Sequence, residues 1–166
     1  MLFRSQFALD YPQRVDTLTL ADTSAGTPPE GRAVWDQRAA SARNDGLEAL
    51  ASATIGRWLT PDFQQAHPEA VEQIREVLLQ TSPQGYARSC EALRDFDVRD
   101  RLAALRMPTL TIAGRHDTGT PPAATAAIAE AIEGARYELL DAAHLAPIEQ
   151  SQRFAAMLET FLQSPV

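Results

Sequence analysis

The sequence has 166 residues, of which 45% are hydrophobic and 22% are charged, and this composition is typical of a globular protein with its own core. Its 22 acidic residues outnumber 15 basic ones, giving a net charge of −7, which argues against a nucleic-acid-binding surface. A single cysteine, Cys90, excludes an internal disulfide and any multi-cysteine metal site. Apolar runs are too short for a membrane span and no signal-peptide pattern occurs, so we expect a soluble, cytoplasmic protein with no membrane partner.

Three short stretches have the composition of β-strands. They are residues 15–22, 108–114 and 135–141, rich in β-branched residues and leucine. A short helix through Ala8 precedes the first, and a long helical stretch, residues 28–96, separates the first from the second. A further helical pattern follows each of the last two strands. Strands separated by helices predict an α/β protein with three parallel strands and right-handed crossovers.

Proline marks the expected helix starts, because its missing N–H is no loss in the first helical turn. Thr27 and Glu30 form a capping-box pattern around Pro28. Further starts are predicted at Thr60–Pro61, Ser82–Pro83, Thr120–Pro121 and Ala146–Pro147. The helical stretch is too long for a simple crossover, so it is interpreted as an insertion at the C-terminal edge of the sheet, where α/β proteins bind ligands. The predicted domains are a core of residues 1–24 and 97–166 and a helical insertion of residues 25–96.

An aspartate and a histidine follow the last two predicted strands. Asp117 lies three residues after Gly114, and His144 follows the third strand just before Pro147. A carboxylate there can orient a histidine that acts as a general base near neutral pH. Alternatively, Asp117 closes a turn or caps the next helix, and His144 is a loop histidine without a catalytic role. His67 and His116 fit surface positions, and no histidine pair or carboxylate cluster has metal-ligand spacing, so no metal is expected.

Four stretches of the sequence carry a family resemblance: "FALDYPQRVDTLTLAD", "RWLTPDF", "TSPQGYARSCEALRDFDVRDRLAALRMPTLTIAGRHDTGTPP" and "LLDAAHLAPIEQ". Together they resemble the C-terminal part of an α/β-hydrolase, most closely the 3-oxoadipate enol-lactonases. The resemblance extends from Phe7 to Leu162. It implies that Asp117 is the acid of a catalytic triad, that His144 is the general base, and that the helical insertion is a cap.

The resemblance also raises two questions about the triad. Some α/β-hydrolases take the acid from the neighbouring strand, which makes Asp22 a rival to Asp117, although the flanking glycine favours Asp117. The serine of such enzymes lies in a G-x-S-x-G turn, which does not occur in this sequence. The resemblance implies that it precedes Met1. Ser5 and Ser24 lack the necessary glycines, and the donors of the oxyanion hole would be missing with the serine.

The sequence therefore supports a lactone or carboxylic ester hydrolase that needs no cofactor and is inactive without its serine. The resemblance implies a small carboxylate-bearing substrate, for which Arg57, Arg88 and Trp58 are candidate binding residues. The alternatives are a non-catalytic module that binds a partner or ligand, and a different enzyme that uses only Asp117 and His144. An uncovered edge strand would recruit other chains, so we expect a homo-oligomer or a requirement for the missing N-terminal half.

Overall fold

The computed structural model describes residues 2–164, and the chain divides into two compact units. One comprises Met1–Ala25 and Val98–Val166 and contains the β-sheet, and the other, Gly26–Asp97, is helical. No helix among the described residues is long and apolar enough to cross a membrane.

The sheet consists of three parallel strands in the order β1-β2-β3. They are β1 (Leu18–Ala21), β2 (Thr109–Gly114) and β3 (Arg136–Leu140). The predicted positions and parallel pairing are thus confirmed, although β1 begins three residues later than expected. The cause is the 3₁₀ turn η1 (Pro12–Arg14), after which the chain joins the sheet only at Leu18.

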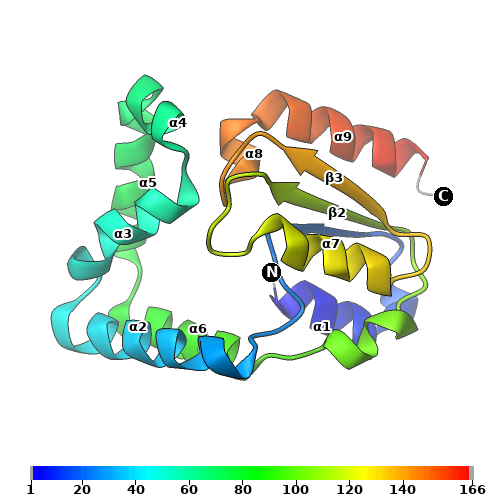
Figure 1. Ribbon diagram of the computed structural model, residues 1–166, viewed down its shortest axis with the longest axis horizontal. Helices are drawn as coiled ribbons and strands as arrows, with labels where there is room; N and C mark the ends of the chain where they lie inside the picture. Colours follow the sequence, from blue (N-terminus) through cyan, green and yellow to red (C-terminus); the bar gives the residue numbers. More distant parts are fainter. Residues whose placement is uncertain (1, 165–166) are drawn as a thin grey trace. The chain divides into compact units, whose positions relative to one another are not determined.

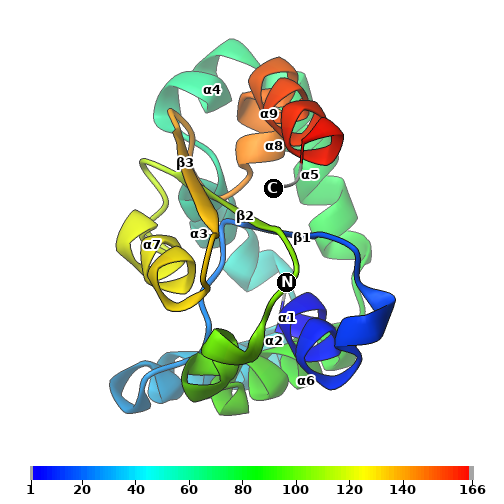
Figure 2. The same cartoon turned by 90° about the vertical axis from the view of Figure 1, so that its right-hand side faces the viewer.

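Helices cover both faces of this sheet, as Figure 2 shows: α1 and α7 lie on one face, and α8 and α9 on the other. Every residue of β2, the central strand, is buried, as expected for a parallel strand covered on both sides. The helices of this unit are α1 (Leu2–Asp10), α7 (Pro122–Ala131), α8 (Ala146–Glu149) and α9 (Ser151–Gln163), with the 3₁₀ helix η3 (Arg99–Ala104).

The core between the sheet and α9 is built from aliphatic strand residues and one aromatic ring. Ile112 and Leu140 are fully buried, and Phe161 of α9 is 2% exposed against them. Burying side chains of this size contributes about 1.5–3 kcal/mol each. The packing therefore fixes the C-terminal ends of β2 and β3, from which the loops with Asp117 and His144 leave. Leu162, the next residue of α9 after Phe161, is 54% exposed.

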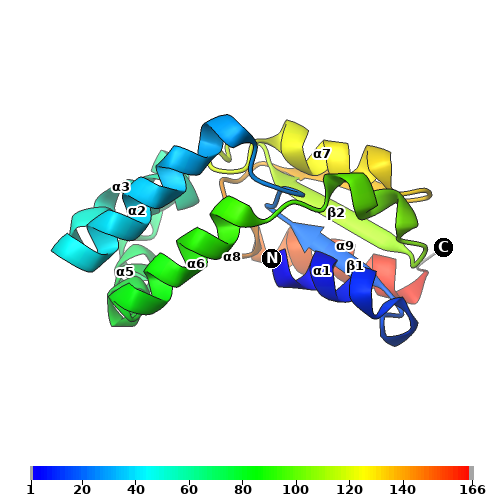
Figure 3. The same ribbon diagram turned by 90° about the horizontal axis from the view of Figure 1, so that it is seen from below.

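The helical unit contains five α-helices. Figures 1 and 3 show α2 and α6 lying side by side and antiparallel, and their small residues Ala39, Ala42 and Ala87 are buried in one cluster with Cys90. The elements, in chain order, are η2 (Pro29–Gly31), α2 (Arg32–Asp45), α3 (Glu48–Trp58), α4 (Pro61–Ala66), α5 (Pro68–Gln80) and α6 (Pro83–Asp95).

Within the helical unit, the predicted helix caps at Thr60 and Ser82 are confirmed, and the one at Thr27 is wrong. The hydroxyls of Thr60 and Ser82 accept hydrogen bonds from the backbone N–H groups three residues later, both at 3.3 Å. Thr27 caps no helix, because α2 begins only at Arg32 after a 3₁₀ turn. Its hydroxyl instead donates to the carbonyl oxygen of Leu93 at 2.7 Å. Thr27 therefore bonds to a residue far away in the chain and not to the first turn of a helix.

Candidate active site

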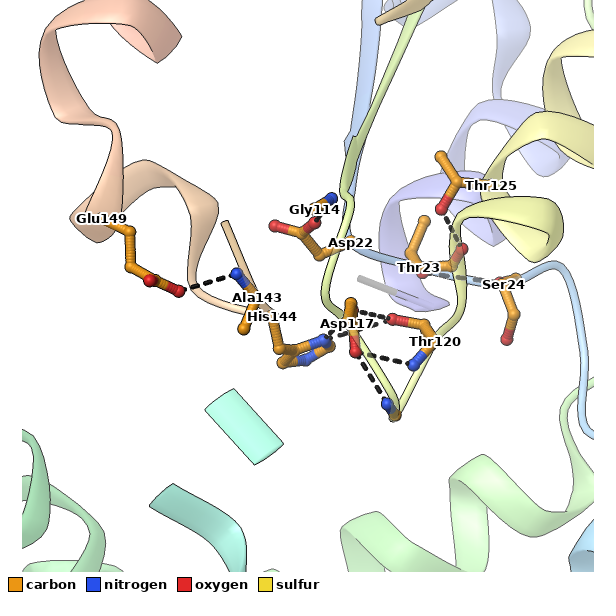
Figure 4. Close-up of polar contacts among 11 residues, drawn as sticks. Asp22, Thr23, Ser24, Gly114, Asp117, Thr120, Thr125, Ala143, His144 and Glu149 are labelled. Carbon is orange, nitrogen blue, oxygen red and sulfur yellow. Dashed lines mark hydrogen bonds and ion pairs between the residues drawn. The ribbon is translucent and has the colours of Figure 1, made fainter. Parts of the chain in front are cut away.

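Asp117 lies in the loop after β2, with its side chain fully buried. Its Oδ1 accepts hydrogen bonds from the N–H groups of Gly119 at 2.7 Å and Thr120 at 2.9 Å. Its Oδ2 accepts a hydrogen bond from the Thr120 hydroxyl at 2.6 Å. Hydrogen bonds from within the same loop therefore fix the orientation of the carboxylate (Figure 4).

His144, in the loop after β3, faces this carboxylate. Its Nδ1 lies 2.7 Å from Oδ2 of Asp117, and the His144 side chain is 30% exposed. The sequence-based prediction that these two residues form a hydrogen-bonded pair at the C-terminal ends of adjacent strands is confirmed. Asp22, the rival acid, makes no hydrogen bond with His144.

The carboxylate of Asp117 is held in its ionised form. Burial alone would raise its pKa, but the hydrogen bonds from His144 and Thr120, together with the charge of His144, outweigh burial and leave the pKa below its ordinary value. An ionised carboxylate only accepts, so the neutral form of the His144 ring carries its proton on Nδ1. In that form Nε2 carries no proton, and no described residue hydrogen-bonds to it. The pair can therefore accept a proton at Nε2 and stabilise the resulting imidazolium.

Two further contacts position the loop that carries His144. Glu149 of α8 accepts a hydrogen bond at Oε1 from the Ala143 N–H at 2.7 Å. Gly114 ends β2 where a Cβ would lie 2.1 Å from the Ala143 carbonyl oxygen and 2.6 Å from that of Ala142. Only a residue without a side chain allows this approach, so Gly114 lets the β3 loop pack directly on the end of β2.

Asp22 follows β1 in the left-handed region, with φ of +48°, where aspartate and asparagine are tolerated better than most residues. It is 5% exposed. Its Oδ1 accepts the Gly114 N–H at 2.7 Å, whereas Oδ2 is buried without a hydrogen-bond partner. Asp22 thus ties the end of β1 to the end of β2 (Figure 4).

Burial raises the pKa of Asp22 to about 6, despite lowering by the Gly114 hydrogen bond and by the charge of His144. The negative charge of Asp117 raises the pKa of Asp22 further, and the Ala146 amide lowers it slightly. The Ala146 amide lies too far from ideal geometry to count as a hydrogen-bond partner of Oδ2. Between the ordinary value of 3.8 and about 6, the folded chain retains a proton that the unfolded chain releases. The free energy of unfolding therefore falls as the pH rises through this window.

We expect Asp22→Asn to remove this pH dependence, because asparagine keeps the acceptor for Gly114 and adopts positive φ but cannot ionise. The stability of the variant relative to the wild type should increase by up to about 3 kcal/mol between pH 4 and pH 7, at about 1.4 kcal/mol per pKa unit. Urea unfolding at several pH values measures the difference. A difference that stays constant over this range contradicts a buried Asp22 with a raised pKa.

The remaining histidines lie outside this arrangement. His116 is exposed, with Nε2 2.8 Å from Oδ1 of Asp141, and exposed His67 lies between α4 and α5. Within residues 2–164, no group of three or more histidine, cysteine, aspartate or glutamate side chains could hold a metal ion.

The three candidate substrate-binding residues all belong to the helical unit. Arg57 and Trp58 are half-buried at the end of α3, and Arg57 Nη2 donates to the Thr54 hydroxyl at 3.2 Å. Arg88 is exposed on α6 and makes no ion pair with a described residue. The structure thus separates Arg57, beside a buried hydroxyl, from Arg88, on the surface.

Sequence reasoning missed three residues that shape the site: Thr120, Glu149 and the structural part played by Asp22. The sequence predicts a helix start at Thr120, but α7 begins at Pro122. The Thr120 hydroxyl instead donates a hydrogen bond to Asp117. The spacing of a threonine three residues after an aspartate is a detectable signal, since such residues close turns locally. No local signal identifies Glu149 or the bond between Asp22 and Gly114, because folding brings these partners together.

Comparison with known proteins identifies the family to which this fold belongs. A family model described as the alpha/beta hydrolase fold matches residues 4–151. Parallel strands whose C-terminal loops carry an aspartate and a histidine in hydrogen-bond contact are the expected arrangement for this class. The chain belongs to the α/β-hydrolase fold family.

The relatives that match most of the chain include enol-lactonases and an esterase. The chain is 36% identical over 156 residues to 3-oxoadipate enol-lactonase 2 of Acinetobacter baylyi, covering 94% of this chain and 58% of the relative. Over 98% of the chain, the structure is similar to the enol-lactonase of Burkholderia xenovorans, with a TM-score of 0.94, 36% identity and 62% of that chain covered. A thermophilic esterase from Thermogutta terrifontis matches with a TM-score of 0.91 and 30% identity, over 99% of this chain and 61% of its own. The chain thus spans less than two thirds of the length of these relatives.

Proposed function

We propose that the chain supplies the acid and base of a Ser-His-Asp hydrolase that cleaves lactones or carboxylic esters. The observation that carries the proposal is the 2.7 Å contact between Nδ1 of His144 and the buried carboxylate of Asp117. The similarity to enol-lactonases supports a lactone substrate. Its carboxylate would need a cationic partner, for which Arg57 and Arg88 remain candidates. The single buried Cys90 is compatible with action in the cytoplasm.

The proposed nucleophile is a serine in a part of the protein outside the printed sequence, because no G-x-S-x-G turn occurs in these 166 residues. Ser5 and Cys90 do not replace it, because both are buried. Ser5 is 3% exposed on α1, and Cys90 is 1% exposed, with a pKa that burial raises. A buried thiol with a raised pKa is a poor nucleophile.

In the proposed reaction, Nε2 of His144 takes the proton of the serine hydroxyl as its oxygen attacks the lactone carbonyl. Asp117 holds the ring and stabilises the imidazolium. The tetrahedral intermediate opens as His144 gives that proton to the leaving oxygen, which leaves an acyl-serine. Water, deprotonated by Nε2, then attacks the acyl-serine. His144 gives that proton to the serine oxygen as the carboxylic acid leaves, which restores the free serine and the neutral ring. The donors of the oxyanion hole would come from the residue after the serine and from an earlier loop.

The first test compares two proteins in the hydrolysis of p-nitrophenyl acetate. The printed chain alone should show no turnover above background, since loss of the nucleophile in a triad enzyme costs on the order of a million-fold. The chain with its natural upstream sequence should turn over the ester, and His144→Ala should abolish that activity. Turnover by these 166 residues alone that disappears with His144→Ala would contradict the proposal. A natural upstream sequence that contains no G-x-S-x-G turn would contradict it as well.

A second candidate function, a non-catalytic module that binds another chain, is favoured by exposed surface on the sheet unit. In the described residues, β1 has a strand neighbour on one side only. Phe3 and Phe7 on α1, and Tyr11 just after it, recur every four residues and are 74%, 45% and 49% exposed. Unpaired strand edges and contiguous apolar surface both recruit partners.

We therefore expect the printed chain by itself to form a homo-oligomer, or to require the remainder of a hydrolase supplied in trans. Light scattering over a dilution series should give a mass that falls toward 18.1 kDa only at low concentration. A monomer at micromolar concentration with a cooperative melt and no binding of an apolar dye would argue against a partner-binding surface.

A further inference from the structure

Thr120 contacts the carboxylate of Asp117 through two different groups. Its backbone N–H donates to Oδ1 at 2.9 Å, and its side-chain hydroxyl donates to Oδ2 at 2.6 Å. The Gly119 N–H also donates to Oδ1, at 2.7 Å. Two backbone groups therefore hold Oδ1. In the described part of the chain, only the Thr120 hydroxyl and the His144 ring hydrogen-bond to Oδ2.

The hydroxyl of Thr120 is not needed to close the loop or to begin the next helix. The two backbone hydrogen bonds to Oδ1 close the turn after Asp117 without it, because an aspartate that accepts from the N–H groups two and three residues later forms such a turn by itself. Helix α7 begins at Pro122, and no side chain caps it. Local structure therefore leaves the bond from the hydroxyl to Oδ2 unexplained.

Oδ2 is the carboxylate oxygen that faces the base. Nδ1 of His144 lies 2.7 Å from this oxygen and 3.2 Å from Oγ1 of Thr120, so the three atoms form a triangle (Figure 4). The hydroxyl proton is directed at Oδ2, which leaves a lone pair of Oγ1 for the proton on Nδ1. The Nδ1 proton therefore has two acceptors, and one of them is hydrogen-bonded to the other.

Holding Oδ2 is important because the terminal torsion of an aspartate side chain has a broad minimum. Hydrogen bonds to Oδ1 alone restrain the plane of the carboxylate less than hydrogen bonds to both oxygens. The Thr120 hydroxyl sits on a β-branched side chain with few rotamers and supplies the second point of attachment. A ring that gains and loses a proton in each step then has an acceptor already in place, and such preorganisation favours catalysis.

We propose that Thr120 is a positioning residue of the hydrolase, whose hydroxyl holds Oδ2 of Asp117 against the Nδ1 proton of His144. Thr120 acts through these two residues and not on the substrate. Its effect on catalysis rests on the proposed function, whereas the contact itself can be tested without catalysis.

NMR of the 166-residue chain tests the contact without any reaction. The Thr120 hydroxyl proton should give its own signal, because a short hydrogen bond to a charged acceptor slows its exchange with water. It should show a nuclear Overhauser effect to the Nδ1 proton of His144. Thr120→Ser should keep both signals. Thr120→Val should lose the hydroxyl signal and broaden the Nδ1 signal through faster exchange.

The contact is refuted if the unaltered chain shows no Overhauser effect between these two protons. An Nδ1 signal that is equally sharp in Thr120→Val would also overturn the proposal. The first of these observations uses the wild-type chain, so it decides the question even where a variant unfolds.

Kinetics in the protein that joins this chain to its proposed serine test the role in catalysis. Thr120→Val keeps the shape of the side chain and the N–H bond to Oδ1. It should lower kcat about tenfold, the effect of losing one hydrogen bond to a charged group, and leave KM unchanged. Thr120→Ser should restore most of the loss.

Thr125→Val is the matched control for Thr120→Val. It removes the hydroxyl of a second threonine, which is fully buried and donates to the Thr23 carbonyl oxygen at 2.8 Å and not to Asp117. We expect kcat to stay unchanged in this variant. A lower melting temperature in both valine variants with unchanged kcat would reduce Thr120 to a structural role and overturn the proposal, as would a serine variant no more active than the valine variant.

These outcomes separate the role of Thr120 from the proposed function. Unchanged kcat in Thr120→Val would refute the role of Thr120 and leave hydrolysis by the joined protein in place. If the joined wild-type protein showed no hydrolysis that depends on His144, the proposed function would fail. The NMR comparison would then still decide whether Thr120 holds the Asp117–His144 pair.

Discussion

Asp117→Asn is expected to reduce kcat for ester hydrolysis by about 10⁴-fold in the protein that joins this chain to its proposed serine. An asparagine at this position keeps the size of the side chain but offers an uncharged amide to Nδ1 of His144. The ring then loses the partner that fixes its tautomer and stabilises the imidazolium. KM should change little, because the Asp117 side chain is fully buried and contacts the His144 ring. Substrate is therefore expected to contact His144 and not Asp117.

Asp22→Asn is the matched control for this prediction. It makes the same chemical change in a second buried aspartate at the same edge of the sheet, but one that bonds to Gly114 and not to His144. We expect its kcat to stay within about tenfold of the wild type, the effect of a nearby charge without direct contact. A large loss in Asp22→Asn combined with a small loss in Asp117→Asn would identify Asp22 as the acid and contradict the assignment made from geometry.

Gly114→Ala is expected to lower the free energy of unfolding by at least about 3 kcal/mol. The new Cβ would lie 2.1 Å from the Ala143 carbonyl oxygen, far inside contact distance. The oxygen belongs to the backbone, and the backbone fixes the position of the Cβ, so no side-chain rotation can remove the clash. Either β2 or the loop that carries His144 must move, and the bond from the Gly114 N–H to Asp22 is strained with it. Urea unfolding followed by circular dichroism measures the loss.

Gly56→Ala provides the opposite control within the same chain. Gly56 lies inside α3, and a Cβ built there meets nothing within 4 Å. Alanine should therefore raise the free energy of unfolding by about 0.5–1 kcal/mol through helix propensity alone. If both variants lost stability equally, or if Gly114→Ala were neutral, the close approach of the β2 and β3 ends would be refuted.

Much of the sheet unit and two helix starts of the helical unit could be predicted from the sequence, because the relevant signals are local. Short runs of β-branched residues identified the three strands, and proline after threonine or serine identified the helix starts at Thr60 and Ser82. The positions of Asp117 and His144 just after their strands were equally local. Parallel strands end at one edge of a sheet, so topology alone brought these two residues together, and the structure confirms their contact.

The tertiary structure decided every feature whose partners lie far apart in the chain. Local pattern predicted a capping box at Thr27, but the Leu93 carbonyl, 66 residues away, took its hydroxyl. The bond between Asp22 and Gly114 spans 92 residues. The sequence by itself determined which elements form and that Asp117 and His144 follow adjacent strands. Burial and charge depend on what folding packs around each side chain, so only the tertiary structure decided which polar groups have partners and how their pKa values shift.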